Sequence, residues 1–254
     1  MAETAVDVHL PGGHLTAAQV QLLAEIAHTH GGGELYLTVH AQLQLRGDAA
    51  ALTDALTAAG LRIDTPTRGR LLTSPLSGRI GGHRDIRELA RTVAARLTDT
   101  DVAPGTVFGL DDGTGDIAAL APTLGLLARP DGRFAVLRDG RDTGLRADPD
   151  DAADVLFTDP PAPGTDTDPL PEAPPAPIGW LDQPDGAVTL AGGLPGGVLP
   201  ARLAEFLAAV ERPLIVTPWR SVLLCDLDEW TAEQVVRVLA PMGLVFDADS
   251  PALR

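Results

Sequence analysis

The segment Leu10-Pro11-Gly12-Gly13 recurs near the other end of the chain as Leu194-Pro195-Gly196-Gly197, and in each copy a leucine stands two residues further on. Each copy continues with a helical pattern, two short apolar segments, a second helical pattern and a closing Gly-Leu-x-x-Asp that begins at Gly60 or Gly243. The two patterns agree over about 55 positions. Such a duplication predicts a pseudo-symmetric core in which each copy buries a face that the other supplies.

The residues at the ends of these patterns predict where the helices of the two copies begin. Thr16 with Gln19, and Thr231 with Gln234, have the spacing of a capping box, and Asp48 is a typical N-cap. The strands expected between the helices cover residues 35–37, 43–45, 214–217 and 222–225, with further short strands such as 6–10 at the edges. We therefore predict an α+β fold with two ferredoxin-like half-domains, paired by pseudo-two-fold symmetry, plus one intervening α/β module.

The region between the copies shows one amphipathic helical pattern from Ile86, followed by alternating apolar segments that are separated by Asp-Gly dipeptides. The Asp111–Asp116 run is similar to part of a calcium loop but lacks the later glutamate, so a hairpin turn is expected there. Residues 158–177 contain eight prolines and predict an extended linker. The expected parts are a first half-domain at 1–66, the α/β module at 67–157, the linker at 158–178 and a second half-domain at 179–254.

Composition excludes several classes of function. The net charge of −16 argues against nucleic acid, whose phosphates would be repelled. All 19 basic residues are arginine, so Schiff-base and phosphate-loop lysine chemistry is excluded. The lone cysteine, Cys225, cannot build a metal cluster within one chain. Without an apolar run that could span a membrane or serve as a signal peptide, we expect a cytoplasmic protein and no membrane partner.

The chain resembles the siroheme nitrite/sulfite reductase superfamily and, within it, the precorrin-3B synthases. The segments that carry this resemblance are Leu10–Thr16, Thr38–Gly47, Ser74–Gly78, Asp111–Asp116, Asp131–Phe134 and Thr217–Arg220. The resemblance implies an oxidoreductase of aerobic cobalamin (vitamin B12) biosynthesis, a monooxygenase that hydroxylates precorrin-3A with dioxygen. It also implies a 4Fe-4S cluster and, in the reductase members, siroheme.

The chain departs from that resemblance at positions that would carry charge or ligate the cluster. His40 stands where the family has an arginine, and Gly69 aligns with another arginine position, although Arg68 and Arg70 flank it. The lysine expected near Gly105 is absent. The chain ends about where the cluster-binding module would begin, which predicts a form truncated before the iron–sulfur module.

The resemblance predicts a tetrapyrrole- or anion-binding site but no catalytic residue and no metal ligand. The predicted binding residues are Thr38, His40, Gln44, Arg46, Arg68, Arg70 and Arg220. Arginine suits this role because its guanidinium binds carboxylates bidentately. The alternatives are structural: His40 packs between the half-domains, the arginines near Ser74 lie on a solvated loop, and Arg220 stacks on Trp219.

Without cluster cysteines, the chain is expected to bind no cofactor alone and to be inactive by itself. A separate cluster-bearing chain would then complete the enzyme. The alternatives are a non-catalytic tetrapyrrole-binding or scaffolding protein, and a truncated gene fragment.

Overall fold

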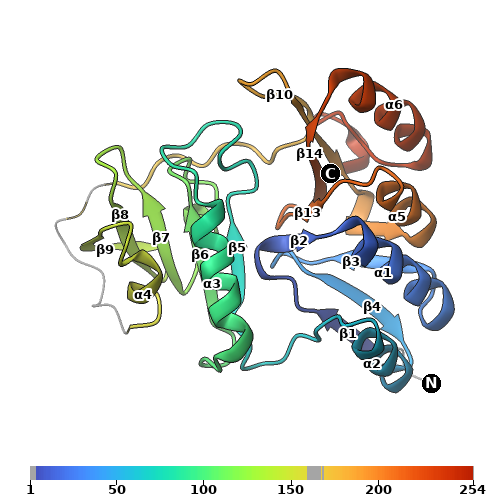
Figure 1. Cartoon of the computed structure of the whole chain (residues 1–254), viewed down its shortest axis with the longest axis horizontal. Helices are drawn as coiled ribbons and strands as arrows, with labels where there is room; N and C mark the ends of the chain where they lie inside the picture. Colours follow the sequence, from blue (N-terminus) through green and yellow to red (C-terminus); the bar gives the residue numbers. More distant parts are fainter. Residues whose placement is uncertain (1–3, 159–166, 168, 254) are drawn as a thin grey trace. The chain divides into compact units, whose positions relative to one another are not determined.

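The computed structural model describes residues 4–158, 167 and 169–253, which divide into two compact units (Figure 1). Unit 1 consists of Met1–Asp64 and Ala176–Arg254, and unit 2 consists of Thr65–Pro175. Unit 1 therefore contains both copies of the repeated segment, and unit 2 contains the region between them. Within the described residues, every helix is too short or too polar to cross a membrane.

The first copy follows the order two strands, helix, two strands, helix. Its elements are β1 (Thr4–Val8), β2 (His14–Leu15), α1 (Ala17–His30), β3 (Glu34–Leu37), β4 (Leu43–Gly47) and α2 (Ala49–Ala58). Both predicted caps are confirmed. Thr16 and Gln19 form a reciprocal capping box at the start of α1, and the Asp48 carboxylate accepts the first amides of α2.

The second copy repeats this order and adds a hairpin strand at its start. Its elements are β10 (Gly179–Asp182), β11 (Val188–Gly193), β12 (Val198–Pro200), α5 (Ala201–Ala208), β13 (Leu214–Val216), β14 (Ser221–Leu227) and α6 (Glu229–Leu239). The predicted capping box at Thr231 is wrong. Asp228 caps α6, and its carboxylate accepts hydrogen bonds from the amide and the hydroxyl of Thr231. An aspartate three residues upstream competes successfully because it satisfies the free amides of the first turn.

The two copies exchange short strands. One sheet has the order β1-β4-β3-β12 and the other has the order β10-β11-β14-β13-β2. Thus β2 of the first copy pairs with β13 of the second, and β12 of the second copy pairs with β3 of the first. Each Leu-Pro-Gly-Gly forms a single 3-10 turn that carries the chain across to the other copy. Gly13 has a φ of +73°, and a Cβ there would overlap the carbonyl oxygen of Val216.

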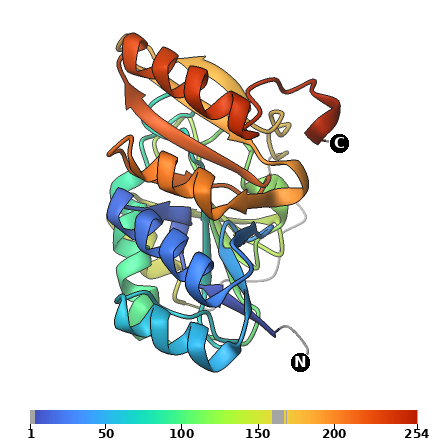
Figure 2. The same cartoon turned by 90° about the vertical axis from the view of Figure 1, so that its right-hand side faces the viewer.

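The helices of unit 1 form one layer over the two sheets. Figure 2 shows α2, α1, α5 and α6 side by side, and α1 packs against α5 where the copies meet. Apolar side chains from both sheets and all four helices form one core, and its fully buried members include Leu23, Leu45, Leu52, Leu207 and Leu224. The α+β fold with paired ferredoxin-like half-domains is confirmed.

Unit 2 is built on a mixed sheet with the order β5-β6-β7-β8-β9. Its elements are β5 (Arg70–Thr73), α3 (Arg87–Asp99), β6 (Val107–Asp111), β7 (Leu124–Ala128), β8 (Phe134–Arg138), β9 (Arg141–Ala147) and α4 (Ala152–Val155). The Asp-Gly turn at 131–132 joins the antiparallel strands β7 and β8, as predicted, and the turn at 139–140 joins β8 to β9, a strand that was not predicted. The hairpin predicted at Asp111–Asp116 is wrong, because β6 and β7 are parallel and require a crossover.

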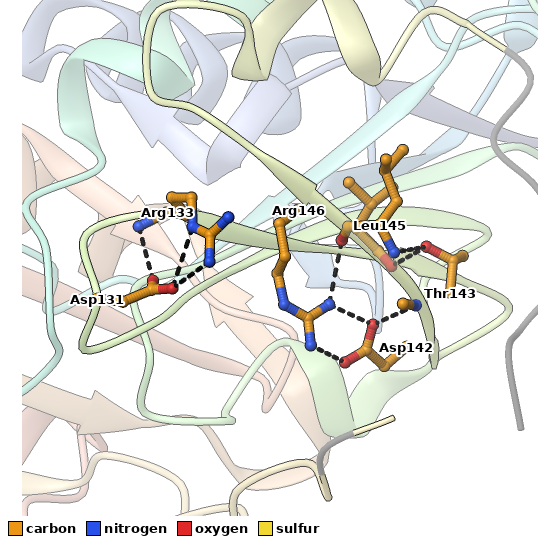
Figure 3. A network of polar contacts seen from close by, with 8 residues as sticks. Asp131, Arg133, Asp142, Thr143, Leu145 and Arg146 are labelled. Atoms are coloured by element: carbon orange, nitrogen blue, oxygen red, sulfur yellow. Dashed lines mark hydrogen bonds and ion pairs between the residues drawn. The ribbon is translucent and has the colours of Figure 1, made fainter. Parts of the chain in front are cut away.

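Two arginines of unit 2 bind nearby carboxylates through their forked guanidinium groups, one on β9 and one in the turn between β7 and β8. Figure 3 shows both terminal nitrogens of Arg146 donating to the buried Asp142 carboxylate, at 2.9 Å each. It also shows the ion pair of Arg133 with Asp131. Leu170 packs on the sheet face opposite α3. The described residues 167 and 169–178 have no helix or strand, and they lie within the predicted linker.

Candidate functional site

The predicted residues Thr38 and His40 lie in the turn between β3 and β4. The strand β3 ends at Leu37, directly before Thr38. The Thr38 amide donates to the Gln42 carbonyl at 2.9 Å, and the Thr38 hydroxyl accepts from the amides of His40 and Gln42. The threonine therefore organises the turn that presents the half-buried His40.

The second copy contains the same turn with different side chains. The Thr217 hydroxyl accepts from the amides of Trp219 and Ser221 and lies 2.7 Å from the Ser221 hydroxyl. Trp219 is thus the counterpart of His40. Arg220, which follows it, is exposed and has a φ of +59°, and its counterpart Ala41 has a φ of +55°. The structure places Arg220 on the surface of this turn rather than in the core.

Gln44 and Arg46 lie together on the face of β4 that points away from the helices. Gln44 donates to the Asp7 carboxylate at 2.8 Å and accepts from the Arg46 Nε at 3.3 Å. The Arg46 guanidinium lies 3.8 Å from the centroid of the Tyr36 ring. Among the described residues, none forms a hydrogen bond or ion pair with its two terminal nitrogens. Arg46 is therefore oriented by its neighbours and exposed.

Arg68 and Arg70 belong to unit 2, whereas the other five predicted residues belong to unit 1. Arg68 reaches the Thr98 carbonyl at 3.5 Å, and its buried Nε has no hydrogen-bond partner among the described residues. Arg70 is half-buried at the start of β5, and its amide donates to the Thr106 carbonyl. A single binding site that includes both units stays a prediction.

The end of β6 carries an acidic loop anchored by the buried Asp111. One oxygen of this carboxylate accepts from the amides of Gly113 and Gly115, and the other accepts from the amides of Ile117 and Ala118. Carboxylate oxygens of Asp111, Asp112 and Asp116 lie within 4.8 Å of one another, a spacing that could hold a cation. Because both Asp111 oxygens already accept two amides each, the geometry favours a loop anchor over a cation site.

Asp116 is a group of this loop that can exchange a proton near neutral pH. Its carboxylate accepts from the Ser74 hydroxyl at 2.5 Å. Burial, followed by the negative charge of Asp111, raises the pKa of Asp116 to about 7. Burial also raises the pKa of Asp112. Sequence reasoning missed this site because it interpreted the run as a turn, although three aspartates within six residues were a visible signal.

The residues present do not fit an iron–sulfur cluster. Such a cluster needs several thiolate ligands, typically four. Cys225 is the one cysteine of these 254 residues, and it is buried within β14 with 6% of its surface exposed.

Sequence reasoning also missed a buried contact made by His9. Its Nδ1 lies 3.5 Å from the Asp64 carboxylate, and both side chains are almost completely buried. The adjacency of His9 to the first Leu-Pro-Gly-Gly was the available signal, because the second copy has Gly193 at the equivalent position.

Comparisons with known proteins agree with this fold. Residues 2–62 match the family model of the nitrite/sulfite reductase ferredoxin-like half domain. No curated protein matches the sequence. Among solved structures, the chain is similar to the Mycobacterium tuberculosis NirA protein, with a TM-score of 0.75 and 14% identity, over 96% of this chain and 57% of that chain. The chain thus spans little more than half of that protein's length, and at this identity the likeness shows the fold alone.

Residues 2–62, most of the first copy, thus match the half-domain model, and the second copy repeats the strand order of the first.

Proposed function

We propose that this protein is a precorrin-3B synthase-like oxidoreductase component, and that it binds the tetrapyrrole on which a second, cluster-bearing chain acts. The half-domain match and the sequence resemblance support the superfamily part of this proposal. The observation that carries the binding role is the arrangement of Arg46. Its guanidinium is held on Tyr36 and Gln44 while its terminal nitrogens have no partner among the described residues.

Each predicted side chain has a defined part in this binding. The Arg46 guanidinium is planar and presents two parallel N–H donors, which match a carboxylate of the macrocycle. Thr38 fixes the turn that presents His40, and a protonated His40 would add a second positive charge. Arg68, Arg70 and Arg220 would contribute further cations. The redox step itself needs a cluster that these residues do not ligate, so binding is the part of the reaction we assign to this chain.

A visible-absorption titration with siroheme, a tetrapyrrole rich in carboxylates, tests this proposal. We expect a saturable spectral shift that Arg46→Ala weakens by about tenfold, the effect of losing one charge-assisted interaction. Arg237→Ala is the matched control, because Arg237 is an exposed arginine on α6 and should have no effect. Either the absence of a shift with a folded chain or equal effects of the two variants would overturn the proposal.

A non-catalytic tetrapyrrole carrier is the second candidate, and the lone buried cysteine favours it. Conversion of precorrin-3A, assayed with this chain in the presence and absence of a cluster-bearing oxidoreductase chain, separates the two. Turnover that needs both chains supports the enzyme component. Binding without turnover in either mixture supports the carrier.

A further inference from the structure

The helical layer of unit 1 ends in a helix whose outer face is partly apolar. Figure 2 shows α6 at one edge of this layer, with α5 beside it. Among the large apolar side chains that are exposed in the described part of the chain, Trp230 on α6 is the most exposed, at 70%. Val238, two helical turns later on the same side of α6, is 45% exposed. Apolar side chains that gather on one exposed face mark an interaction surface, because burying them is favourable.

An apolar groove adjoins these two side chains. It has a volume of about 290 Å³ and lies between α6 and the end of α5. Its apolar lining includes Phe206, Val210, Trp230, Val235, Val238 and Leu239. Of its polar side chains, Thr231 already donates to the Asp228 carboxylate, so Gln234 alone remains for a polar ligand. The groove therefore suits an apolar side chain better than a cofactor, whose site needs several converging polar groups.

The first copy shows that the fold does not require this apolar face. Its helix α2 lies at the other edge of the layer, and Ala50 stands where α6 has Trp230, as the second residue of the helix. The exposed side chains of α2 are small or polar. In addition, α1 has fourteen residues, whereas its counterpart α5 has eight and covers less of the helix beside it. The second copy thus differs from the first by an exposed tryptophan beside a groove.

Two charges beside the apolar face indicate which partner it fits. Glu233 and Arg237 are exposed one turn apart, and neither side chain forms an ion pair or hydrogen bond with another described residue. When two α6 helices pack antiparallel with the two-fold axis at Gln234, Trp230 lies level with the partner's Val238. Glu233 then lies about 3 Å along the axis from the level of the partner's Arg237, within reach of two long side chains. The same patch is therefore complementary to itself in shape and in charge.

We propose that α6 forms the interface of a two-fold homodimer, in which Trp230 of each copy packs into the partner's groove. A two-fold interface uses one patch on both subunits, so the patch must supply both a protruding group and a recess. Trp230 is the protruding group and the groove is the recess. Because a net charge of −16 makes two copies repel each other, the pairs of Glu233 with the partner's Arg237 supply a compensating attraction. This surface lies on the helical side of the sheets, whereas Arg46 lies on the other side, so the dimer does not depend on the proposed tetrapyrrole binding.

Sedimentation equilibrium of the full chain tests the dimer. The contact is one helix wide, so we expect a weak dimer with a Kd of about 10–100 μM. Trp230→Ala should raise this Kd at least about tenfold, because a tryptophan at the centre of an interface contributes much of its binding energy. Trp180→Ala is the matched control, since Trp180 is an exposed tryptophan on β10, and it should leave the Kd unchanged. A chain that stays monomeric at about 1 mM, or equal effects of the two variants, would overturn the proposal.

Exchange of the two charges tests the antiparallel arrangement itself. Glu233→Arg alone and Arg237→Glu alone place like charges opposite each other across the interface, so each should raise the Kd at least about fivefold. The double variant restores opposite charges, and its Kd should return to within about twofold of the wild-type value. Circular dichroism verifies that each variant keeps its helices, as expected for exposed positions. A double variant that associates as weakly as the single variants would also overturn the proposal.

Discussion

The two copies of the half-domain have the same strand order but opposite chemistry on the sheet face that points away from the helices. In the first copy, Gln44 stands between Tyr36 and Asp7 in the ladder. In the second copy the equivalent residue is Leu223, which stands between Ile215 and Ala191. The polar trio is partly exposed, and the apolar trio is buried. The duplicated backbone thus depends on the helix-covered core, and the other face of each sheet is free to specialise.

Exchanging residues between these faces should give the largest effect. Leu223→Gln places an amide in a fully buried apolar position and should destabilise the fold by about 4 kcal/mol. The reverse change, Gln44→Leu, removes two partly exposed hydrogen bonds, one to Asp7 and one from Arg46, and should cost about 1 kcal/mol. Urea unfolding followed by circular dichroism measures both. Equal costs would show that the two faces do not differ in their tolerance.

The second largest difference is expected between the two Leu-Pro-Gly-Gly turns, when the last glycine of each turn is replaced by alanine. Gly13→Ala combines a φ of +73° with an overlap against the Val216 backbone, and should cost about 3 kcal/mol. At Gly197 the nearest atom to an added Cβ is the Arg220 Cδ at 2.8 Å, which belongs to a flexible side chain. Gly197→Ala should therefore cost about 1 kcal/mol. Thermal unfolding of both variants tests this order, and a larger loss at Gly197 would contradict it.

A smaller difference in stability is expected between the threonines of the two β-turns, Thr38 and Thr217. Thr217 is fully buried and bonds two amides and the Ser221 hydroxyl, so Thr217→Val should cost about 2 kcal/mol. Thr38 is half-buried and bonds two amides, so Thr38→Val should cost about 1 kcal/mol. Chemical denaturation is the measurement, and siroheme titration of Thr38→Val shows in addition whether the turn matters for binding.

The helix caps should show no difference between the copies. Asp48 accepts from two amides of α2, and Asp228 accepts from the amide and the hydroxyl of Thr231. Alanine at either position should cost about 1 kcal/mol. If the two costs, measured by the same urea unfolding, differ by more than about 1 kcal/mol, the helical layer is less symmetric than its caps suggest.

The sequence predicted what short-range chemistry decides. The capping box of Thr16 and the cap at Asp48 follow from hydrogen bonds within one helical turn, and both are confirmed. The cap predicted at Thr231 was wrong. Thr231 and Gln234 have the spacing of a capping box, but the Asp228 carboxylate is the better acceptor for the first amides of α6. The run from Asp111 misled for a related reason. Asp-Gly suits a hairpin, but the carboxylate here anchors a crossover loop whose amides lie up to seven residues away.

The pairing of strands that lie far apart in the chain could not be predicted from the sequence. Strand exchange by β2 and β12 leaves no periodic signal, because segments of two or three residues are too short to show alternation. For the side chains of the candidate site, the sequence could predict local contacts but not long-range ones. The contact of Gln44 with Arg46 is local and could be expected from alternation along a strand, whereas the His9–Asp64 pair joins residues far apart in sequence.

The exchanged strands also bear on how such a chain can arise. A single copy, cut from the chain, would lack the strand that borders its sheet, since that strand comes from the other copy. Two identical copies could complete each other's sheets by exchanging this border strand, as in a domain-swapped homodimer. The present chain is then the covalent form of such an isologous pair, with one gene encoding both partners. Unit 2 lies between the two copies along the chain, and the copies pair through their own strands rather than through that connection.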